Sequence, residues 1–169
     1  VWTSAANTGG GLIGFNNANG VNSSVVITNS YATGNLTGPQ TYGANYYFGG
    51  LIGSNTVNQS GANASVIGSY ATGSVTSTSA LGNNVGGLVG LNSGGVANSN
   101  VNISQSYATG SVTAPKTAGG LVGVIGSGAG AANIDQSYAT GNVQQTATSS
   151  SAGGLVGQVS LPNTNGYTQ

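Results

Sequence analysis

Charged side chains are almost missing from this chain of 169 residues: Lys116 is the only basic residue and Asp135 the only acidic one. Typical domains are about 25% charged, so the polarity here comes from Asn, Ser and Thr instead. A net charge of zero offers no electrostatic attraction to nucleic acid or to acidic lipid. We therefore expect no nucleic-acid partner and no membrane insertion.

Cysteine, histidine and methionine are also absent, which excludes disulfides and thiolate or imidazole metal sites. Without histidine no serine has its usual base, and one carboxylate cannot form a glycosidase pair. A Ser–Lys pair through Lys116 remains, but Lys116 follows Pro115 in a short loop, where we expect a solvated side chain. We predict no catalytic residue, no cofactor and no metal, and hence not an enzyme.

Long apolar runs and a signal-peptide pattern are missing as well, so the sequence predicts no membrane-spanning helix. The first residues, Val1-Trp2, include no initiator Met and suggest a processed protein or an excised segment. The 32 glycines are compatible with a flexible linker. Val, Ile and Leu nevertheless recur at fixed places and proline is rare, which favours a folded repeat protein.

Two five-residue motifs alternate along the chain. Gly-Gly-Leu-(Ile/Val)-Gly occurs at Gly10–Gly14, Gly49–Gly53, Gly86–Gly90, Gly119–Gly123 and Gly153–Gly157. Ser-Tyr-Ala-Thr-Gly occurs at Ser30–Gly34, Ser69–Gly73, Ser106–Gly110 and Ser137–Gly141. The spacer from the first motif to the second has 15, 15, 15 and 13 residues, whereas the return spacer has 14, 12, 8 and 11. The first spacer is therefore expected to be held by packing, and the second to be a surface loop.

Apolar residues alternate with period two around each tyrosine, which is typical of β-strands. Before each tyrosine they lie at even spacings, as Ile27 does four residues before Tyr31. After it they lie at odd spacings, as Leu36 does five residues after Tyr31. One residue of phase is lost between them, so a corner must lie near the Ser-Tyr step. Strands that meet at one corner per repeat indicate an all-β parallel β-solenoid, with coils about 4.8 Å apart.

We predict a single repeat domain over residues 1–169, with about five coils of 31–39 residues and uncapped ends. The repeats lie near 10–48, 49–85, 86–118, 119–152 and 153–169, and residues 1–9 form the tail of a preceding repeat. Each glycine pair is expected to turn a corner or to let the opposite wall approach. The predicted core ladder is Leu12, Leu51, Leu88, Leu121 and Leu155. The next ladder, Ile13, Ile52, Val89, Val122 and Val156, is expected to face outward for lateral contacts.

Aromatic residues are the candidates for ligand or inter-subunit contact, because their rings suit sugar or protein recognition. The alternative for the repeat tyrosines is corner packing, and for the aromatic loop it is to cover the glycine-rich edge. The candidates are Trp2, Tyr42, Tyr46, Tyr47, Phe48, Tyr31, Tyr70, Tyr107 and Tyr138.

Gly-Gly-Leu-Val-Gly followed by Ser-Tyr-Ala-Thr-Gly resembles the GLUG repeat of bacterial surface proteins. That repeat occurs in large secreted adhesins related to filamentous haemagglutinin, and in surface peptidases outside their catalytic domain. The resemblance covers nearly the whole chain and implies an extracellular or cell-surface β-solenoid region without catalytic residues. The chain departs from the usual pattern in its loops, especially Thr41–Phe48, and in its lack of charge.

These patterns predict a structural and adhesive element that builds a filament by end-to-end stacking of its own copies, with glycans or a neighbouring cell surface as further partners. One alternative is ice binding, since Thr33, Thr72, Thr109 and Thr140 would form a flat Thr ladder on a nearly uncharged solenoid. Another is an accessory repeat domain of a larger surface protein.

Overall fold

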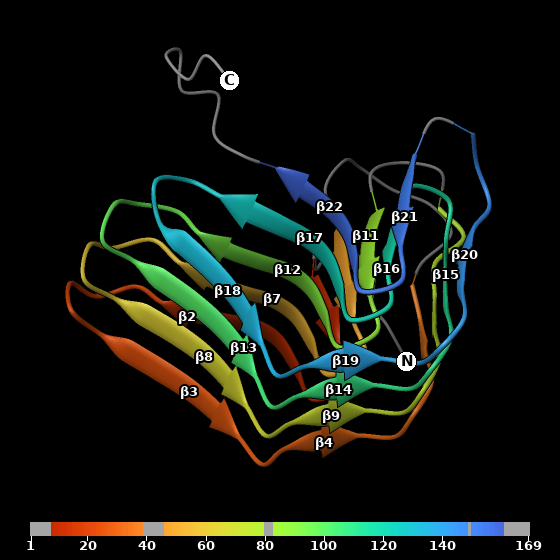
Figure 1. Ribbon diagram of the computed structural model, residues 1–169, viewed down its shortest axis with the longest axis horizontal. Coiled ribbons are helices and arrows are strands. Elements are labelled where there is room, and N and C mark those ends of the chain that lie inside the picture. The colour runs from red at the N-terminus through yellow and green to blue at the C-terminus, as the bar shows by residue number, and fades with distance from the viewer. Residues whose placement is uncertain (1–7, 39–45, 80–82, 149, 161–169) are drawn as a thin grey trace.

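A computed structural model describes residues 8–38, 46–79, 83–148 and 150–160. These residues form a parallel β-solenoid without helix, as predicted, and the chain passes in turn through five sheets that we call A to E (Figure 1). Within the described ranges, sheets A and B have five strands and sheets C, D and E have four. The described residues therefore form four complete coils and the A and B strands of a fifth.

Neighbouring strands in every sheet come from successive coils and pair in parallel, in register. Sheet A holds β1 (Thr8–Gly10), β6 (Tyr46–Gly49), β11 (Asn83–Gly86), β16 (Thr117–Gly119) and β21 (Ser151–Gly153). Sheet B holds β2 (Ile13–Ala18), β7 (Ile52–Val57), β12 (Val89–Gly94), β17 (Val122–Ser127) and β22 (Val156–Ser160). Sheet C holds β3 (Ser24–Thr28), β8 (Asn63–Ile67), β13 (Asn100–Ser104) and β18 (Ala131–Asp135).

Sheets D and E are made of shorter strands. Sheet D holds β4 (Tyr31–Ala32), β9 (Tyr70–Ala71), β14 (Tyr107–Ala108) and β19 (Tyr138–Ala139). Sheet E holds β5 (Leu36–Thr37), β10 (Val75–Thr76), β15 (Val112–Ala114) and β20 (Val143–Gln145). In-register pairing stacks equivalent residues of successive coils, so that each repeated position becomes a ladder.

The corner expected near the Ser-Tyr step lies between sheets C and D, at the residue before each serine. This residue has a positive φ of 48° at Asn29, 59° at Gly68, 50° at Gln105 and 46° at Gln136. Asn, Gly and Gln occupy a left-handed conformation here that reverses which face of the chain points inward. The phase loss read from the sequence is thus confirmed and has a definite backbone cause.

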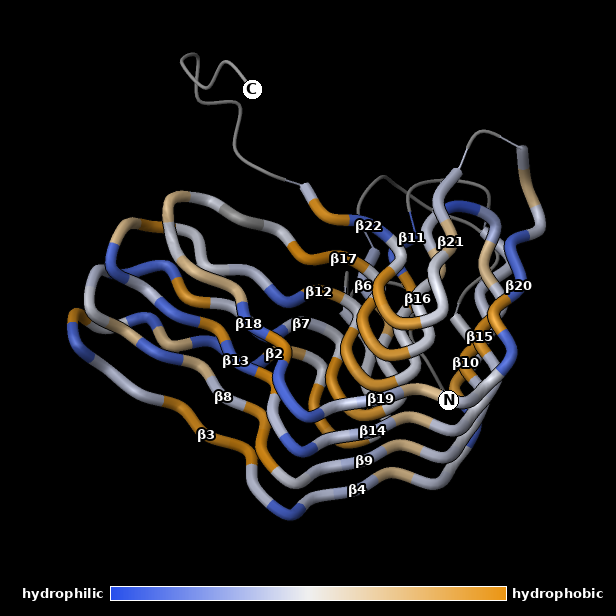
Figure 2. The backbone as a smooth tube through the Cα atoms, in the orientation of Figure 1, coloured by the Kyte–Doolittle hydropathy of each residue, from blue (hydrophilic) through white to orange (hydrophobic). Residues whose placement is uncertain are grey.

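The interior has two lobes joined by a narrow waist (Figures 1 and 2). Phe48, Val75, Val85 and Val112 pack in the lobe between sheets A and E. The other lobe, between sheets B and C, contains Val57, Ala64 and Val101. The waist contains the predicted core ladder, and Leu51, Leu88 and Leu121 are fully buried there.

The waist exists because the corner between sheets A and B points into the molecule. We call this corner, residues Gly49–Gly53 and their equivalents, the glycine corner. A Cβ on Gly50 would lie 2.8 Å from the Cβ of Ala71 on the opposite sheet D, and 2.1 Å from the carbonyl oxygen of Gly87. A Cβ on Gly53 would lie 2.6 Å from the backbone N of Gly9. The glycines therefore both turn the corner and let the opposite wall approach.

The ladder after the leucines does not face outward, and this expectation is wrong. Ile52, Val89 and Val122 are fully buried in the core, and Ile13 and Val156 pack against it. Asn55, three residues after Ile52, also faces the interior, where its Nδ2 donates to the carbonyl oxygen of Ala64 in sheet C at 3.4 Å. Because Ile52 and Asn55 are three residues apart and both face inward, the alternation of inward and outward side chains shifts by one residue near Gly53. The Ile/Val ladder is buried and offers no lateral contact surface.

Asn16, Asn55 and Asn92 form a second unexpected feature, a polar ladder inside the solenoid. The Nδ2 of Asn16 donates to Oδ1 of Asn55 at 2.7 Å, and the Nδ2 of Asn55 donates to Oδ1 of Asn92 at 2.8 Å. The next position in register is Ile125, and the Nδ2 of Asn92 has no partner among the described residues. The ladder thus satisfies two of its buried amides and ends on an apolar side chain.

Candidate functional site

The repeat tyrosines form a continuous stack on the outer face of sheet D. Ring centroids are 5.2 Å apart between Tyr31 and Tyr70, 4.9 Å between Tyr70 and Tyr107, and 5.2 Å between Tyr107 and Tyr138. The planes of neighbouring rings differ by 8°, 2° and 6°. Because the faces of the inner rings cover one another, only Tyr31 and Tyr138 present a free ring face, and these are 59% and 52% exposed.

Each serine of the same motif fastens the corner between sheets C and D. The Oγ of Ser69 donates to the carbonyl oxygen of Ile67 at 3.0 Å and accepts the N–H of Ser30 at 3.1 Å. Ser106 repeats both contacts one coil further, with Ser104 and Ser69. We call residues Ser69–Gly73 and their equivalents the tyrosine corner. Sequence reasoning missed these serines, although their recurrence in all four copies is the signal that marks them.

The stacked phenol groups influence one another. Partial burial, followed by the neighbouring Tyr70 and Tyr138, raises the pKa of Tyr107 above its usual value of 10.0. A phenolate at Tyr107 is disfavoured because it would be partly desolvated and would stand beside two other phenol oxygens. Tyr107 is therefore neutral at physiological pH, and the stack offers ring edges and hydroxyl groups.

The aromatic segment before the second glycine corner does not gather its rings at the surface. Tyr46 and Phe48 point into the lobe between sheets A and E, where they are 7% and 1% exposed. Their assignment as ligand contacts is corrected, because strand alternation turns both inward and leaves only Tyr47 on the outer face. Phe48 leans towards the first coil, where Gly38 leaves room for its ring. Trp2 and Tyr42 lie outside the described residues.

Sheets A and B diverge from the glycine corner like the arms of a V (Figure 1). A hollow lined by residues of both sheets lies between them and forms a groove. It encloses about 410 Å³ between the outer faces of the two sheets. We call it the A–B groove. Sheet A contributes Tyr47 and Asn84, and Lys116 lies in the bend just before β16. Sheet B contributes Leu91, Ser93, Val124, Gly126, Gln158 and Ser160.

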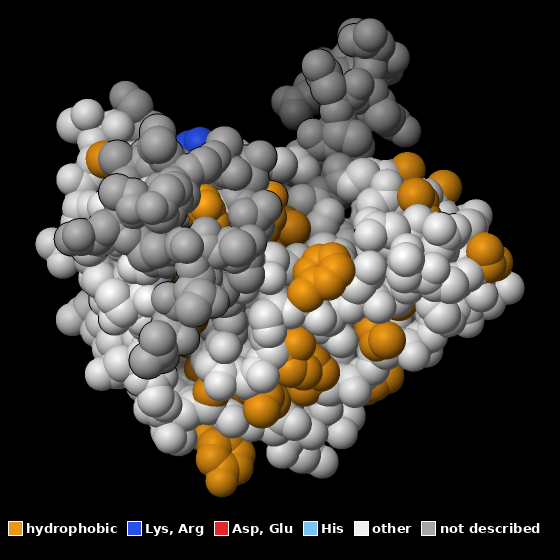
Figure 3. Space-filling model, turned by 180° about the vertical axis from the view of Figure 1, so that it is seen from behind, with side chains coloured by type: hydrophobic (Ala, Val, Ile, Leu, Met, Phe, Trp, Pro, Cys, Tyr) orange, Lys and Arg blue, Asp and Glu red, His pale blue; other side chains and the backbone are white. Residues whose placement is uncertain are grey.

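The only two charged side chains are separated by the fold. Lys116 is exposed, as expected, and borders the A–B groove, whereas Asp135 is an exposed residue of β18 in sheet C. Figure 3 shows one face of the molecule, on which hydrophobic side chains and one basic group interrupt a neutral surface. The described residues therefore do not bring the one lysine and the one carboxylate together.

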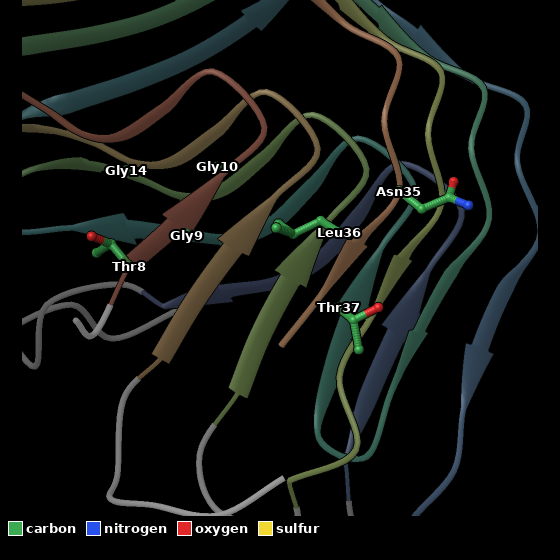
Figure 4. A pocket seen from close by; sticks show the side chains of 7 residues that line it. All are labelled: Thr8, Gly9, Gly10, Gly14, Asn35, Leu36 and Thr37. Carbon is green, nitrogen blue, oxygen red and sulfur yellow. The ribbon is translucent and has the colours of Figure 1, made fainter. Parts of the chain in front are cut away.

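A second hollow of about 660 Å³ lies at the N-terminal end of the lobe between sheets A and E (Figure 4). Leu36 points into it, while the side chains of Asn35 and Thr37 point away. Gly9 stands at the position that Phe48 fills in the next coil, so no described residue of the first coil fills this lobe as Phe48 does. The hollow therefore continues the core at the end of the described rod.

Comparison with protein-family models, with curated proteins and with solved structures finds no match. Among the described residues there is no helix able to cross a membrane and no group of three or more His, Cys, Asp or Glu. The arguments for function therefore rest on the ladders, the groove and the ends of the rod.

Proposed function

We propose that this chain is a structural, non-enzymatic element of a bacterial extracellular fibre or surface adhesin, in which further coils stack on the ends of the described rod. The observation that carries the proposal is the difference in exposure between the inner and the terminal leucines of the core ladder. Leu51, Leu88 and Leu121 are 0% exposed, whereas Leu12 and Leu155 at its ends are 50% and 39% exposed. A further coil at either end would bury these side chains as the inner coils bury theirs.

The backbone supports the same proposal. The strands of the first coil, β1 to β5, all stand at the ends of their sheets, and so do β18 to β22 at the other end of the rod. Among the described strands, each of these pairs with a neighbour on one side only, and its other side forms a template for another parallel strand. A coil from a second copy gives a heterologous contact that grows into a filament. A coil from the same polypeptide gives a longer solenoid with identical contacts.

The extracellular setting rests on the GLUG-like motifs and on the scarcity of charge. An uncharged solenoid presents repeated Asn, Ser and Thr ladders over its whole length, and such ladders need no metal or disulfide to hold their register. The terminal rings of the tyrosine stack add an aromatic contact at each end, where a further tyrosine would continue the stack. End-to-end association of copies is thus part of the proposal.

The test compares two lysine substitutions on the same coil. Leu12 faces inward and Val26 outward, and their exposed fractions are similar, 50% and 53%. We expect the wild-type chain to gain mass with concentration and to form rods in electron micrographs that exceed the ~24 Å of five coils. Leu12→Lys should shorten the rods because it places a charge between coils, and Val26→Lys should not. A dispersed wild-type monomer at high concentration would contradict end-to-end association.

Ice binding is a second candidate, favoured by the exposed ladder of Thr33, Thr72, Thr109 and Thr140. The tyrosine stack stands two residues away on the same sheet, so the flat face is narrow. A thermal-hysteresis measurement on the wild-type chain and on Thr109→Tyr separates the two functions. Hysteresis that disappears in the variant would support ice binding, and its absence in the wild type would exclude it.

A further inference from the structure

The A–B groove has the size and the lining of a ligand site. Its volume of about 410 Å³ lies within the range of small-molecule and oligomer sites, about 300–1,000 Å³. Leu91 and Val124 give one wall an apolar surface, and the ring of Tyr47 stands on the other wall. Polar groups accompany them: among the described residues, no side-chain hydrogen bond holds the Asn84 amide or the Ser93 hydroxyl, both of which line the groove.

The direction of the groove indicates an elongated ligand. Tyr47 belongs to the second coil, Asn84 and Leu91 to the third, Lys116 and Val124 to the fourth, while Gln158 and Ser160 come from the fifth. Four coils span three intervals of ~4.8 Å, or roughly 14 Å along the rod. Each of the four coils contributes at least one polar group to the lining, and the third and fourth coils add the aliphatic side chains of Leu91 and Val124. A chain molecule would therefore meet polar contacts at every coil.

The walls do not suit an extended peptide. Both are faces of sheets whose backbone groups already pair along the rod, and peptide recognition by strand addition needs a free sheet edge. A peptide in the groove would bury its own N–H and C=O groups with few partners. Nucleic acid would need several basic groups, and the chain has one.

Sugar rings fit these walls better. Their hydroxyls pair with amides and hydroxyls such as those of Asn84 and Ser93, and their C–H faces pack on tyrosine and on aliphatic side chains. Lys116 borders the same groove, and the only acidic side chain of the chain, Asp135, lies on sheet C. We propose that the A–B groove binds an extended oligosaccharide that carries a carboxylate-bearing sugar, whose charge lies at Lys116.

The experiment is isothermal titration of the 169-residue chain at low ionic strength with two acidic probes and one neutral probe. The acidic probes are a galacturonic acid hexamer and a hyaluronan hexasaccharide, and the neutral probe is cellohexaose. We expect saturable binding of at least one acidic probe, with lower affinity at high salt because the contact to Lys116 is screened. Absence of binding by both acidic probes overturns the proposal.

Three variants locate the site. Asn84→Trp should abolish binding because it fills the groove from sheet A, while Asn142→Trp, at an exposed position outside the groove, should bind like the wild type. Lys116→Gln should weaken acidic probes about tenfold, the effect of losing one charge-assisted hydrogen bond, without changing the affinity for cellohexaose. Circular dichroism confirms that each variant is folded. Binding that survives Asn84→Trp, or that Lys116→Gln leaves unchanged, contradicts the assignment.

Discussion

The two corners of each coil are built in opposite ways. The glycine corner requires residues without a side chain, because the backbones of sheets A, B and D pack so closely at Gly50 and Gly53 that a Cβ does not fit there. The tyrosine corner depends on side chains that are present, since Ser69 fastens the backbone and Tyr70 stacks on its neighbours outside the core. The two corners meet where the Cβ of Ala71, in the tyrosine corner, packs against Gly50 of the glycine corner.

The glycine corner therefore sets the distance between the walls of the coil, whereas the tyrosine corner holds neighbouring strands together. A corner made of close backbone contacts fixes how near two walls come, and any added atom forces the walls apart. A corner made of hydrogen bonds and stacked rings can lose one contact at a smaller cost, because the loss of one hydrogen bond does not force the walls apart. We therefore expect substitutions at the glycine corner to have larger effects on stability than substitutions at the tyrosine corner.

The largest effect is expected for Leu88→Asp at the glycine corner. Leu88 is fully buried among apolar side chains, and an unpaired carboxylate there is very costly, so the variant should not fold. Leu12→Asp, in the same ladder but half exposed, should retain β-structure by circular dichroism. A folded Leu88→Asp with unchanged melting temperature would show that this corner is not rigid.

Gly87→Ala tests the close approach itself. Its Cβ would lie 2.1 Å from the carbonyl oxygen of Gly120 and 2.9 Å from the Cβ of Ala108, and we expect a loss of about 3 kcal/mol in urea unfolding. Gly154 holds the same motif position in the fifth coil, where a Cβ would meet nothing within 4 Å. Gly154→Ala should therefore leave stability nearly unchanged, and equal losses in both variants would refute the steric explanation.

At the tyrosine corner, Ser106→Ala removes the acceptor of the Ser69 N–H and a donor to the carbonyl oxygen of Ser104. A buried N–H without a partner costs about 1–3 kcal/mol, so we expect a loss of about 2 kcal/mol. Ser30 in the first coil donates to Thr28, and its Oγ accepts from no other described residue. Ser30→Ala should consequently cost less than Ser106→Ala in the same urea titration.

The smallest effect concerns pH. With one lysine and one aspartate, the free energy of unfolding should be nearly constant between about pH 4 and 9. The raised pKa of Tyr107 means that above about pH 10 the folded state keeps a proton that the unfolded state has lost. Stability should then fall as pH rises, and Tyr107→Phe should reduce that fall. Thermal melts that show rising stability above pH 10 would contradict this sign.

The fold could be predicted from the sequence because in-register stacking repeats each position. Leu51, Leu88 and Leu121 recur at one motif position, and their burial requires no knowledge of other parts of the coil. The corner at Asn29 and Gly68 was also visible, as a change from even to odd spacing of apolar residues. The alternation of apolar and polar residues was enough to predict both the leucine ladder and the corner, because each is determined by residues close to its motif in the sequence.

The candidate sites could be predicted less well. The cluster of aromatic residues predicted a contact surface that included Tyr46 and Phe48, yet both are core residues. Of the three described aromatic residues in this segment, Tyr47 lines the A–B groove. The groove joins side chains on two sheets, such as Asn84 and Leu91, which are seven residues apart, with others from different coils. No spacing in the sequence reveals it, because it depends on the angle at which sheets A and B diverge.

By itself, the sequence determined the period, the parallel register and the identity of the leucine and tyrosine ladders, because identical residues stacked at a fixed interval define them. Only the tertiary structure decided which way the glycine corner points. That corner packs inward on Ala71, across the coil, and this contact buries Ile52, opens the A–B groove and divides the core into two lobes. Such a contact joins segments about 20 residues apart, and its direction follows from how closely two backbones can approach once every side chain between them is removed.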